Sequence, residues 1–112
     1  NEMKSMNKVQ LIGWLGNDPE IITIKDGRLL ARLRLATDVF ISQADGTAKK
    51  YTSWHTVKLW DQAKIELFRN YLTKGSHVLV EGRIEYRQYR DKLGVTRKVT
   101  EIMAIHLVDL DR

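Results

Sequence analysis

Residues 51–75 read YTSWHTVKLWDQAKIELFRNYLTKG, and they decide the fold because a strand passes directly into a helix there. Residues 51–60 alternate with the period of two that is typical of a strand. One side carries Ser53, His55, Val57 and Leu59, and the other carries Thr52, Trp54, Thr56, Lys58 and Trp60. Asp61 can cap the helix that follows, because its carboxylate accepts hydrogen bonds from backbone N–H groups of the first turn.

This helix is short, and we expect it to end at Lys74 and Gly75. Residues three and four positions apart share one face of a helix, which predicts an apolar stripe. The expected stripe consists of Ala63, Leu67, Phe68, Tyr71 and Leu72.

Strand patterns lie on both sides of this segment. Residues 7–15 alternate in the same way, and residues 17–19 (NDP) end that strand. Residues 20–24 lead through Asp26-Gly27, a strong hairpin signal, into another alternating run. In that run Leu29, Ala31, Leu33 and Leu35 share one face, while Arg32 and Arg34 point the other way. After a polar stretch over 42–50, residues 77–89 and 95–107 indicate two long strands joined near 91–94.

The order of elements predicts a mainly β fold. One short helix cannot cover both faces of a five-stranded antiparallel sheet, so closure into a small barrel removes the exposed edges. The position of the helix between the third and fourth strands, with a long hairpin between the fourth and fifth, favours an OB-fold barrel. An open α+β sheet is the alternative.

Composition indicates one basic domain without disulfides. The 112 residues contain no cysteine, and 19 Lys and Arg face 14 Asp and Glu, a formal charge of +5 that favours a polyanionic partner. No apolar run approaches the length of a membrane span, and we expect a cytoplasmic protein. We expect a mobile extension over residues 1–5, the OB-fold domain over 6–109 and a C-terminal end over 110–112.

The strongest local signal for function lies on the side of the 51–60 strand that carries Trp54, Lys58 and Trp60. Aromatic rings stack on bases of any identity, and cations between them neutralise phosphates. Burial of the tryptophans against a helix or a subunit is the alternative. That alternative would leave Val57 and Leu59 in solvent at about 1.5–3 kcal/mol each, so we predict that the tryptophan face is wet.

The last long hairpin carries a second set of rings and cations. Tyr86, Arg87, Tyr89 and Arg90 recur near its tip, within the basic run Arg83, Arg87, Arg90, Lys92, Arg97 and Lys98 that only Glu85 and Asp91 oppose. A mobile arm of this composition is expected to close over a nucleic-acid strand. A solvated basic hairpin is the alternative reading.

The chain resembles the bacterial-type single-stranded DNA-binding proteins from about residue 6 to 109. The matching segments, in order, are residues 7–9 (NKV), Gly13, 15–20 (LGNDPE), 35–37 (LAT), 54–55 (WH), 71–72 (YL), 74–75 (KG) and 80–83 (VEGR). The resemblance implies an OB-fold that assembles as a homo-oligomer, a tetramer or a dimer. It also implies that this assembly binds single-stranded DNA during replication, recombination and repair.

Site residues follow from the resemblance position by position. It places base-stacking rings at Trp54, Trp60 and Tyr89 and, within one residue, at Phe40. It places phosphate-contacting lysines at Lys8 and Lys74, and a histidine of the subunit interface at His55. Strand alternation and local charge add Arg32, Arg34, Lys58, Arg87 and Tyr86 to the expected DNA-binding set.

Departures from the family limit what is expected of partners. Members that recruit other replication proteins end in an acidic, phenylalanine-tipped tail, whereas this chain ends Asp109-Leu110-Asp111-Arg112. Recruitment of replication proteins is therefore in doubt, and the chain is expected to be either the core of a longer protein or a short form. A primosome-type accessory protein, which uses the same barrel for protein contacts, is the alternative function.

Two further classes find less support in the sequence. A nuclease on this barrel needs clustered carboxylates for a metal, and none are apparent: residues 18–20 (DPE) indicate a turn, and His55, His77 and His106 are scattered. We expect no catalysis, no metal and no cofactor. RNA binding in the manner of cold-shock proteins lacks that family's aromatic motifs.

Overall fold

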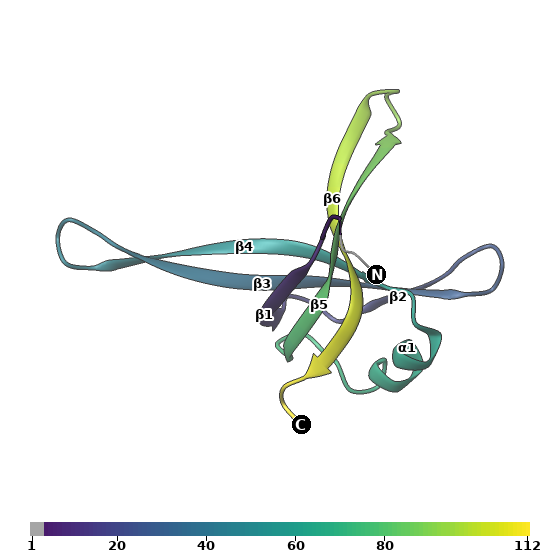
Figure 1. Ribbon diagram of the computed structural model, residues 1–112, viewed down its shortest axis with the longest axis horizontal. Helices are drawn as coiled ribbons and strands as arrows, with labels where there is room; N and C mark the ends of the chain where they lie inside the picture. Colours follow the sequence, from purple (N-terminus) through teal and green to yellow (C-terminus); the bar gives the residue numbers. More distant parts are fainter. Residues whose placement is uncertain (1–3) are drawn as a thin grey trace.

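The computed structural model describes residues 4–112, so the expected mobile extension over 1–5 lies in part outside the described residues. Its elements follow one another as strands, one helix and strands (Figure 1). They are β1 (Val9–Leu15), β2 (Glu20–Thr23), β3 (Leu29–Ser42), β4 (Ala48–Leu59), α1 (Gln62–Phe68), β5 (His77–Arg90) and β6 (Thr96–Asp109). The predicted position of the helix, after the strand that contains Trp54, is confirmed.

The sheet closes into a barrel with five strand positions. The strand order is β1-β5-β6-β4-β3-β2, and β1 also pairs with β3. β2 pairs with residues 29–32 of β3 and β1 with residues 35–36, so β1 and β2 share one position. The pairing of β4 with β6, at Val57 and Lys58, is parallel, and the other pairings are antiparallel. The predicted OB-fold barrel is confirmed.

Closure between β1 and β3 requires a glycine at residue 13. A Cβ atom on Gly13 would lie 2.0 Å from the carbonyl oxygen of Ala36, closer than any two such atoms can approach. The backbones of β1 and β3 can therefore cross only where no side chain intervenes.

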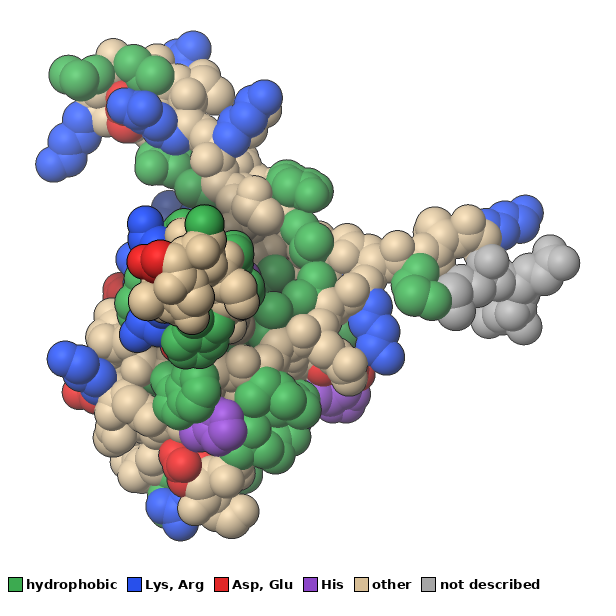
Figure 2. Space-filling model, turned by 90° about the vertical axis from the view of Figure 1, so that its left-hand side faces the viewer, with side chains coloured by type: hydrophobic (Ala, Val, Ile, Leu, Met, Phe, Trp, Pro, Cys, Tyr) green, Lys and Arg blue, Asp and Glu red, His purple; other side chains and the backbone are tan. Residues whose placement is uncertain are grey.

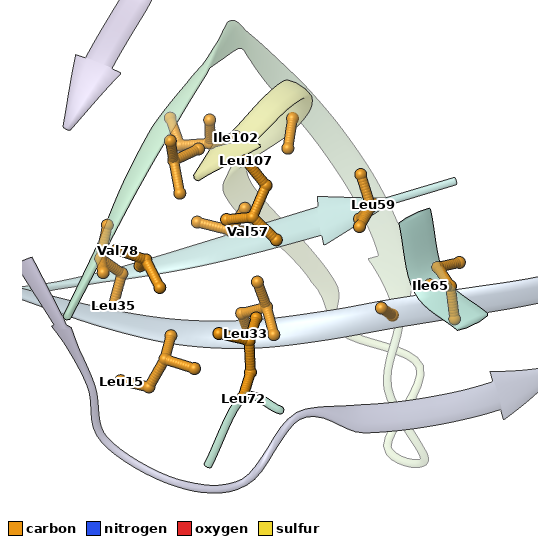
Figure 3. Close-up of a cluster of buried hydrophobic side chains, with 13 residues drawn as sticks. Leu15, Leu33, Leu35, Val57, Leu59, Ile65, Leu72, Val78, Ile102 and Leu107 are labelled. Carbon is orange, nitrogen blue, oxygen red and sulfur yellow. The ribbon is translucent and has the colours of Figure 1, made fainter. Parts of the chain in front are cut away.

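The inward faces of the strands form one hydrophobic core (Figure 3). Leu33 and Leu35 of β3 meet Val57 and Leu59 of β4 there, which confirms the predicted alternation. The labelled interior is completed by Ile65 of α1 and by Leu15, Leu72, Val78, Ile102 and Leu107, and Val80 belongs to the same cluster.

The helix begins as predicted but ends early and buries only part of the predicted stripe. Asp61 caps it, accepting a hydrogen bond from the backbone N–H of Lys64 at 3.1 Å. The helix ends at Phe68, so the expected end at Lys74-Gly75 is wrong. Two members of the predicted stripe face the core, half-buried Phe68 in the helix and buried Leu72 after it, whereas Ala63, Leu67 and Tyr71 are exposed. Ile65, which the predicted stripe omitted, is the buried residue of the helix.

Three hairpins project from the barrel: β2–β3, β3–β4 and β5–β6 (Figure 1). The β3–β4 hairpin is longer than predicted, because β3 continues to Ser42 and β4 begins at Ala48 where a polar loop was expected. Its turn contains Gly46 at φ +87°, and the β2–β3 turn contains Gly27 at φ +89°, a conformation that glycine adopts readily. The β5–β6 hairpin, which was predicted from the sequence, projects in a different direction from the other two hairpins (Figure 1).

Candidate nucleic-acid interface

The surface of β3 and β4 that points away from the core combines rings and cations. Antiparallel register places Arg32 opposite Lys58, Arg34 opposite Thr56, Ala36 opposite Trp54, Asp38 opposite Thr52 and Phe40 opposite Lys50. Residues directly opposite in a sheet share a face. We call these ten residues the outer face. Arg32 and Arg34 therefore share one surface as predicted, and Trp54 lies on the same face.

Trp54 lies in the middle of the outer face with 51 % of its surface exposed. The Arg34 guanidinium carbon is 5.1 Å from the centroid of the Trp54 ring, within cation–π range. Below the ring lies Gly16, where an added Cβ would be 2.3 Å from Cζ3 of the indole. A hollow of about 240 Å³ opens beside the ring, lined by Gly16, Asn17, Arg34 and Trp54. The indole is thus supported from the barrel and open to the solvent.

Trp60 follows β4 and is half-buried. The Arg28 guanidinium carbon lies 5.3 Å from the centroid of its ring. The Gln62 side chain donates to the Trp60 carbonyl oxygen and also bonds both backbone polar groups of Leu29, each at 2.8 Å, which fixes the strand end that carries the ring. Neither Trp54 nor Trp60 belongs to the core cluster.

Lys58 departs from its expected role as an exposed cation. Only 11 % of its side chain is exposed, and its Nζ lies 3.1 Å from Oε1 of Glu101. The same carboxylate accepts from Arg87, at 2.9 Å to Nε and 3.3 Å to Nη2. The parallel pairing of β4 with β6 brings Glu101 to this place. The expectation that Lys58 is an exposed cation is wrong, since its charge is paired and largely buried, while its contact with DNA stays a prediction.

The three charges of this network hold the base of the β5–β6 hairpin against β4. The hydrogen bond from Arg87, with that from Lys58, keeps the pKa of Glu101 below its ordinary value. The same bond raises the pKa of Arg87. Two cations and one carboxylate leave one positive charge, and Arg87, with 42 % of its side chain exposed, is the member that meets solvent.

The β5–β6 hairpin divides the residues predicted near its tip between two faces. Arg87 and Tyr89 lie opposite Val99 and Arg97, on the side of Glu101, and the Arg87 guanidinium is 5.6 Å from the Tyr89 ring centroid. They line a groove of about 390 Å³ with Arg32, Thr56, Val99 and Glu101. This groove joins the hairpin to the outer face.

Tyr86 lies on the other side of the hairpin. It is opposite Thr100, and successive residues of a strand alternate between faces, so Tyr86 and Tyr89 point in opposite directions. The four residues predicted near the hairpin tip are therefore divided between its two faces, and their expected contact with a nucleic-acid strand stays a prediction. Arg90, opposite Thr96, shares the side of Tyr86.

The remaining predicted contacts are more scattered. Phe40 is 67 % exposed near the end of the outer face. Lys74 is exposed, and its backbone N–H donates to Asp18 at 2.8 Å, which keeps it near the β1–β2 connection that contains Gly16. Lys8 precedes β1, and its Nζ is 3.9 Å from Glu81 of β5. Of these three, only Phe40 belongs to the outer face.

His55 points to the inner side of β4, opposite Leu35. Its Nε2 lies 2.9 Å from Oγ1 of Thr37, and burial lowers its pKa, which favours the neutral ring. A single chain does not test its expected place in a subunit interface, which remains a prediction.

Sequence reasoning missed three residues that shape the site: Gly16 under Trp54, Arg28 on Trp60, and Glu101 between Lys58 and Arg87. Glu101 carried a usable signal, because it is an acid immediately before the apolar run 102–105 (IMAI) in a strand. The contacts of Gly16 and Arg28 depend on strand pairing, which local sequence does not specify.

Other classes of site find no support in the described residues. Within residues 4–112, no group of three or more acidic or histidine side chains is placed to hold a metal ion. No helix of the described chain is both long and apolar enough to cross a membrane.

Comparison with solved structures matches the whole barrel and its hairpins. The structure titled Plasmodium falciparum SSB complex with ssDNA is 32 % identical in sequence and superposes with a TM-score of 0.86, covering 99 % of this chain and 100 % of that one. A deletion mutant of the single-stranded DNA-binding protein from Thermus aquaticus is 30 % identical with a TM-score of 0.77 and covers 94 % of this chain and 50 % of its own.

Sequence comparison agrees. The single-stranded DNA-binding protein of Rhizobium meliloti is 37 % identical over 100 residues, which are 88 % of this chain and 58 % of that protein, so the chain spans little more than half the length of this relative. The profile of the Single-strand binding protein family matches residues 6–109. With the barrel, its hairpins and the exposed rings of the outer face, this match shows that the chain belongs to the Single-strand binding protein family.

Proposed function

We propose that this chain binds single-stranded DNA without regard to sequence, through the outer face and the groove beside it. The observation that carries the proposal is Trp54, an indole half exposed in the middle of a strand face, supported by Gly16 and flanked by Arg34. Large exposed aromatics on a rigid sheet are otherwise unfavourable in water, and a nucleobase is a partner that covers them.

Base stacking supplies the sequence-independent part of this affinity. Each base–aromatic stack contributes about 1–3 kcal/mol and differs little between bases, because every base has a π-face. Trp54, Trp60, Tyr89 and Phe40 are the rings that this proposal uses. Trp54 and Tyr89 each lie within 6 Å of a guanidinium, at 5.1 Å and 5.6 Å, so a stacked base brings its phosphate close to a positive charge.

Phosphate neutralisation supplies the rest. Arg34 is exposed and forms no ion pair within the described residues, whereas Arg32 lies 3.6 Å from Glu20 and Arg87 is held by Glu101. Lys50 and Lys74 are also exposed and form no ion pair within the described residues, so these two lysines and Arg34 are available to phosphates at this site. Contacts of this kind release counterions, so affinity falls as salt rises.

The same proposal includes properties that the single chain does not display. A homo-oligomer, tetramer or dimer, places several outer faces in one particle, with His55 at a subunit contact. Protection of single strands in replication, recombination and repair, a cytoplasmic location and the lack of catalysis complete the proposal. The relatives named above support the part of the proposal that concerns single-stranded DNA.

Fluorescence anisotropy with labelled oligo(dT), duplex DNA and poly(U), measured over a range of salt, tests this function. We expect tight binding of oligo(dT), weaker binding of duplex and a steep loss of affinity with salt. Trp54→Ala is expected to weaken oligo(dT) binding by about 5- to 150-fold while the fold survives. Weak, salt-insensitive binding of oligo(dT) would contradict the proposal and favour an accessory role through protein contacts.

A matched control separates the outer face from the rest of the surface. Tyr71 is exposed to a similar extent as Trp54, at 46 %, and the Arg112 guanidinium lies 4.0 Å from the centroid of its ring. Tyr71 lies after the helix, however, and not on the outer face. Tyr71→Ala should therefore leave oligo(dT) binding unchanged. An equal loss in both variants would show that ring exposure, and not position, determines binding.

A further inference from the structure

The side of the β5–β6 hairpin that faces away from Arg87 and Tyr89 forms a surface of its own. Register places Tyr86 opposite Thr100, Gln88 opposite Lys98, and Arg90 opposite Thr96. We call these six residues the reverse face. Because strand residues alternate, none of them can reach the groove that contains Tyr89 without a twist of the hairpin.

Tyr86 is the most exposed aromatic side chain among residues 4–112, at 78 %. Beside it lies a hollow of about 460 Å³ lined by Tyr86, Gln88, Lys98 and Thr100 together with Arg87 and Val99. Hollows of about 300–1,000 Å³ are typical of small-ligand sites, so the space next to the ring can admit a nucleotide.

The charge of the reverse face is entirely positive. It carries Arg90 and Lys98 and no acidic residue, and neither cation lies within 4.0 Å of a carboxylate in the described part of the chain. On the opposite side of the hairpin Arg87 is paired with Glu101 and Arg97 with Asp91. Figure 2 shows Lys and Arg side chains gathered around the free end of this hairpin. The unpaired charge of the hairpin is therefore concentrated on its reverse face and its tip.

We propose that the reverse face is a second contact site for single-stranded DNA, in which a base stacks on Tyr86 while Lys98 and Arg90 neutralise its phosphates. The proposal rests on the proposed function and extends it: a strand that leaves the outer face along Tyr89 continues over the hairpin onto Tyr86. The hairpin then lies between two segments of DNA, with one tyrosine on each side.

Charge complementarity selects a polyanion as the occupant. A protein partner that covered Tyr86 with apolar groups would also have to desolvate two unpaired cations, which is costly without acidic partners. A single DNA strand supplies a negative charge at each phosphate and a base that can stack on each tyrosine. Thr96, Gln88 and Thr100 add uncharged hydrogen-bonding groups that suit a polar ligand.

Oligo(dT) of two lengths distinguishes the reverse face from the main site. Single OB-folds cover about 4–16 nucleotides, so a strand of about 8 nucleotides occupies the outer face alone and one of about 35 reaches beyond it. Tyr86→Ala is expected to weaken binding of the long strand by about 5- to 150-fold and to leave the short strand unaffected. Tyr89→Ala, the matched control on the other side of the same hairpin, is expected to weaken both.

Two further variants check the chemistry. Tyr86→Phe keeps the ring and should bind the long strand as the unaltered chain does. Lys98→Gln should lower the salt dependence of long-strand binding by about one counterion and leave the short strand unchanged. Tyr86 is exposed, so thermal unfolding of the Tyr86→Ala variant is expected to match that of the unaltered chain.

The outcomes that overturn the inference are distinct from failure of the proposed function. Unchanged long-strand binding in Tyr86→Ala would remove the reverse face from the DNA path. Equal losses for both lengths would assign Tyr86 to the main site. If the unaltered chain bound neither strand, the proposed function itself would fail and the second contact with it.

Discussion

Replacing Glu101 by glutamine is expected to destabilise the protein strongly although it removes only one charge. Glu101 pairs with Lys58 at 3.1 Å and with Arg87 at 2.9 Å, and only 5 % of the glutamate side chain and 11 % of the lysine are exposed. Without the carboxylate, Lys58 keeps a positive charge in a site largely cut off from water. Removing one partner of a buried ion pair costs about 3–5 kcal/mol.

We place the loss for Glu101→Gln at roughly 3 kcal/mol, at the lower end of that range, because the Arg87 side chain is 42 % exposed and recovers hydration. For a domain near 100 residues, each kcal/mol corresponds to a change in Tm of about 4–8 °C, so Tm should fall by roughly 12–24 °C. Urea unfolding and calorimetry at equal protein concentration measure this change.

A double variant identifies the cause. Lys58→Met combined with Glu101→Gln removes the stranded ammonium, and replacement of a buried pair by uncharged groups is often neutral. The double variant should therefore recover most of the lost stability. A loss below about 1 kcal/mol for Glu101→Gln, or a double variant as unstable as the single one, would refute the view that Lys58 depends on this carboxylate.

The structure also predicts the effects of two further substitutions and of acidic pH. Gly16→Ala should weaken oligo(dT) binding with little change in Tm, because the new methyl would lie 2.3 Å from the Trp54 indole and must displace it. Unaltered binding would show that oligo(dT) binding does not require this position of the ring. The pKa of Glu101 is lowered by Arg87, so the stability that Glu101 contributes is complete above its ordinary pKa of 4.5 and is lost as pH falls through the lower folded value. The urea midpoint of Glu101→Gln should therefore change less over that acidic range than the midpoint of the unaltered chain. Parallel curves for the two proteins would contradict the assignment. Ile65→Ala should lower the free energy of unfolding by about 2–5 kcal/mol, because it leaves a cavity under the helix. Urea unfolding measures this loss, and a loss near zero would mean that the helix does not seal the barrel.

Local patterns were sufficient for most of the barrel. Alternation in residues 29–35 and 51–60 predicted which side of β3 and β4 is buried, because burial of one face imposes the period of two. Asp61 predicted the helix start, since a cap is a contact within one turn. The extent of β3 and β4 was missed because their projecting ends pair by backbone hydrogen bonds without burying either face, so residues 42–50 have the polar composition of a loop.

The errors at the site come from contacts between distant segments. Alternation placed Lys58 on the correct face, but the parallel pairing with β6 that buries it against Glu101 joins residues more than 40 positions apart. The division between Tyr86 and Tyr89 was available from the sequence, because residues three apart in a strand point to opposite sides. The helix stripe was predicted in part: Phe68 and Leu72 face the core, but Ile65 has the same helical spacing from them and takes the buried place instead of Ala63, Leu67 and Tyr71.

The proposed binding mode requires that bases stack on Trp54 and Trp60. The chain has three tryptophans, and Trp14 stacks on His77, with ring centroids 4.8 Å apart, where β1 pairs with β5. Two-dimensional NMR of the indole N–H groups during titration with oligo(dT) follows all three rings at once. We predict that the signals of Trp54 and Trp60 shift to saturation while that of Trp14 stays in place; unshifted Trp54 and Trp60 signals at saturating DNA would contradict the proposed binding mode.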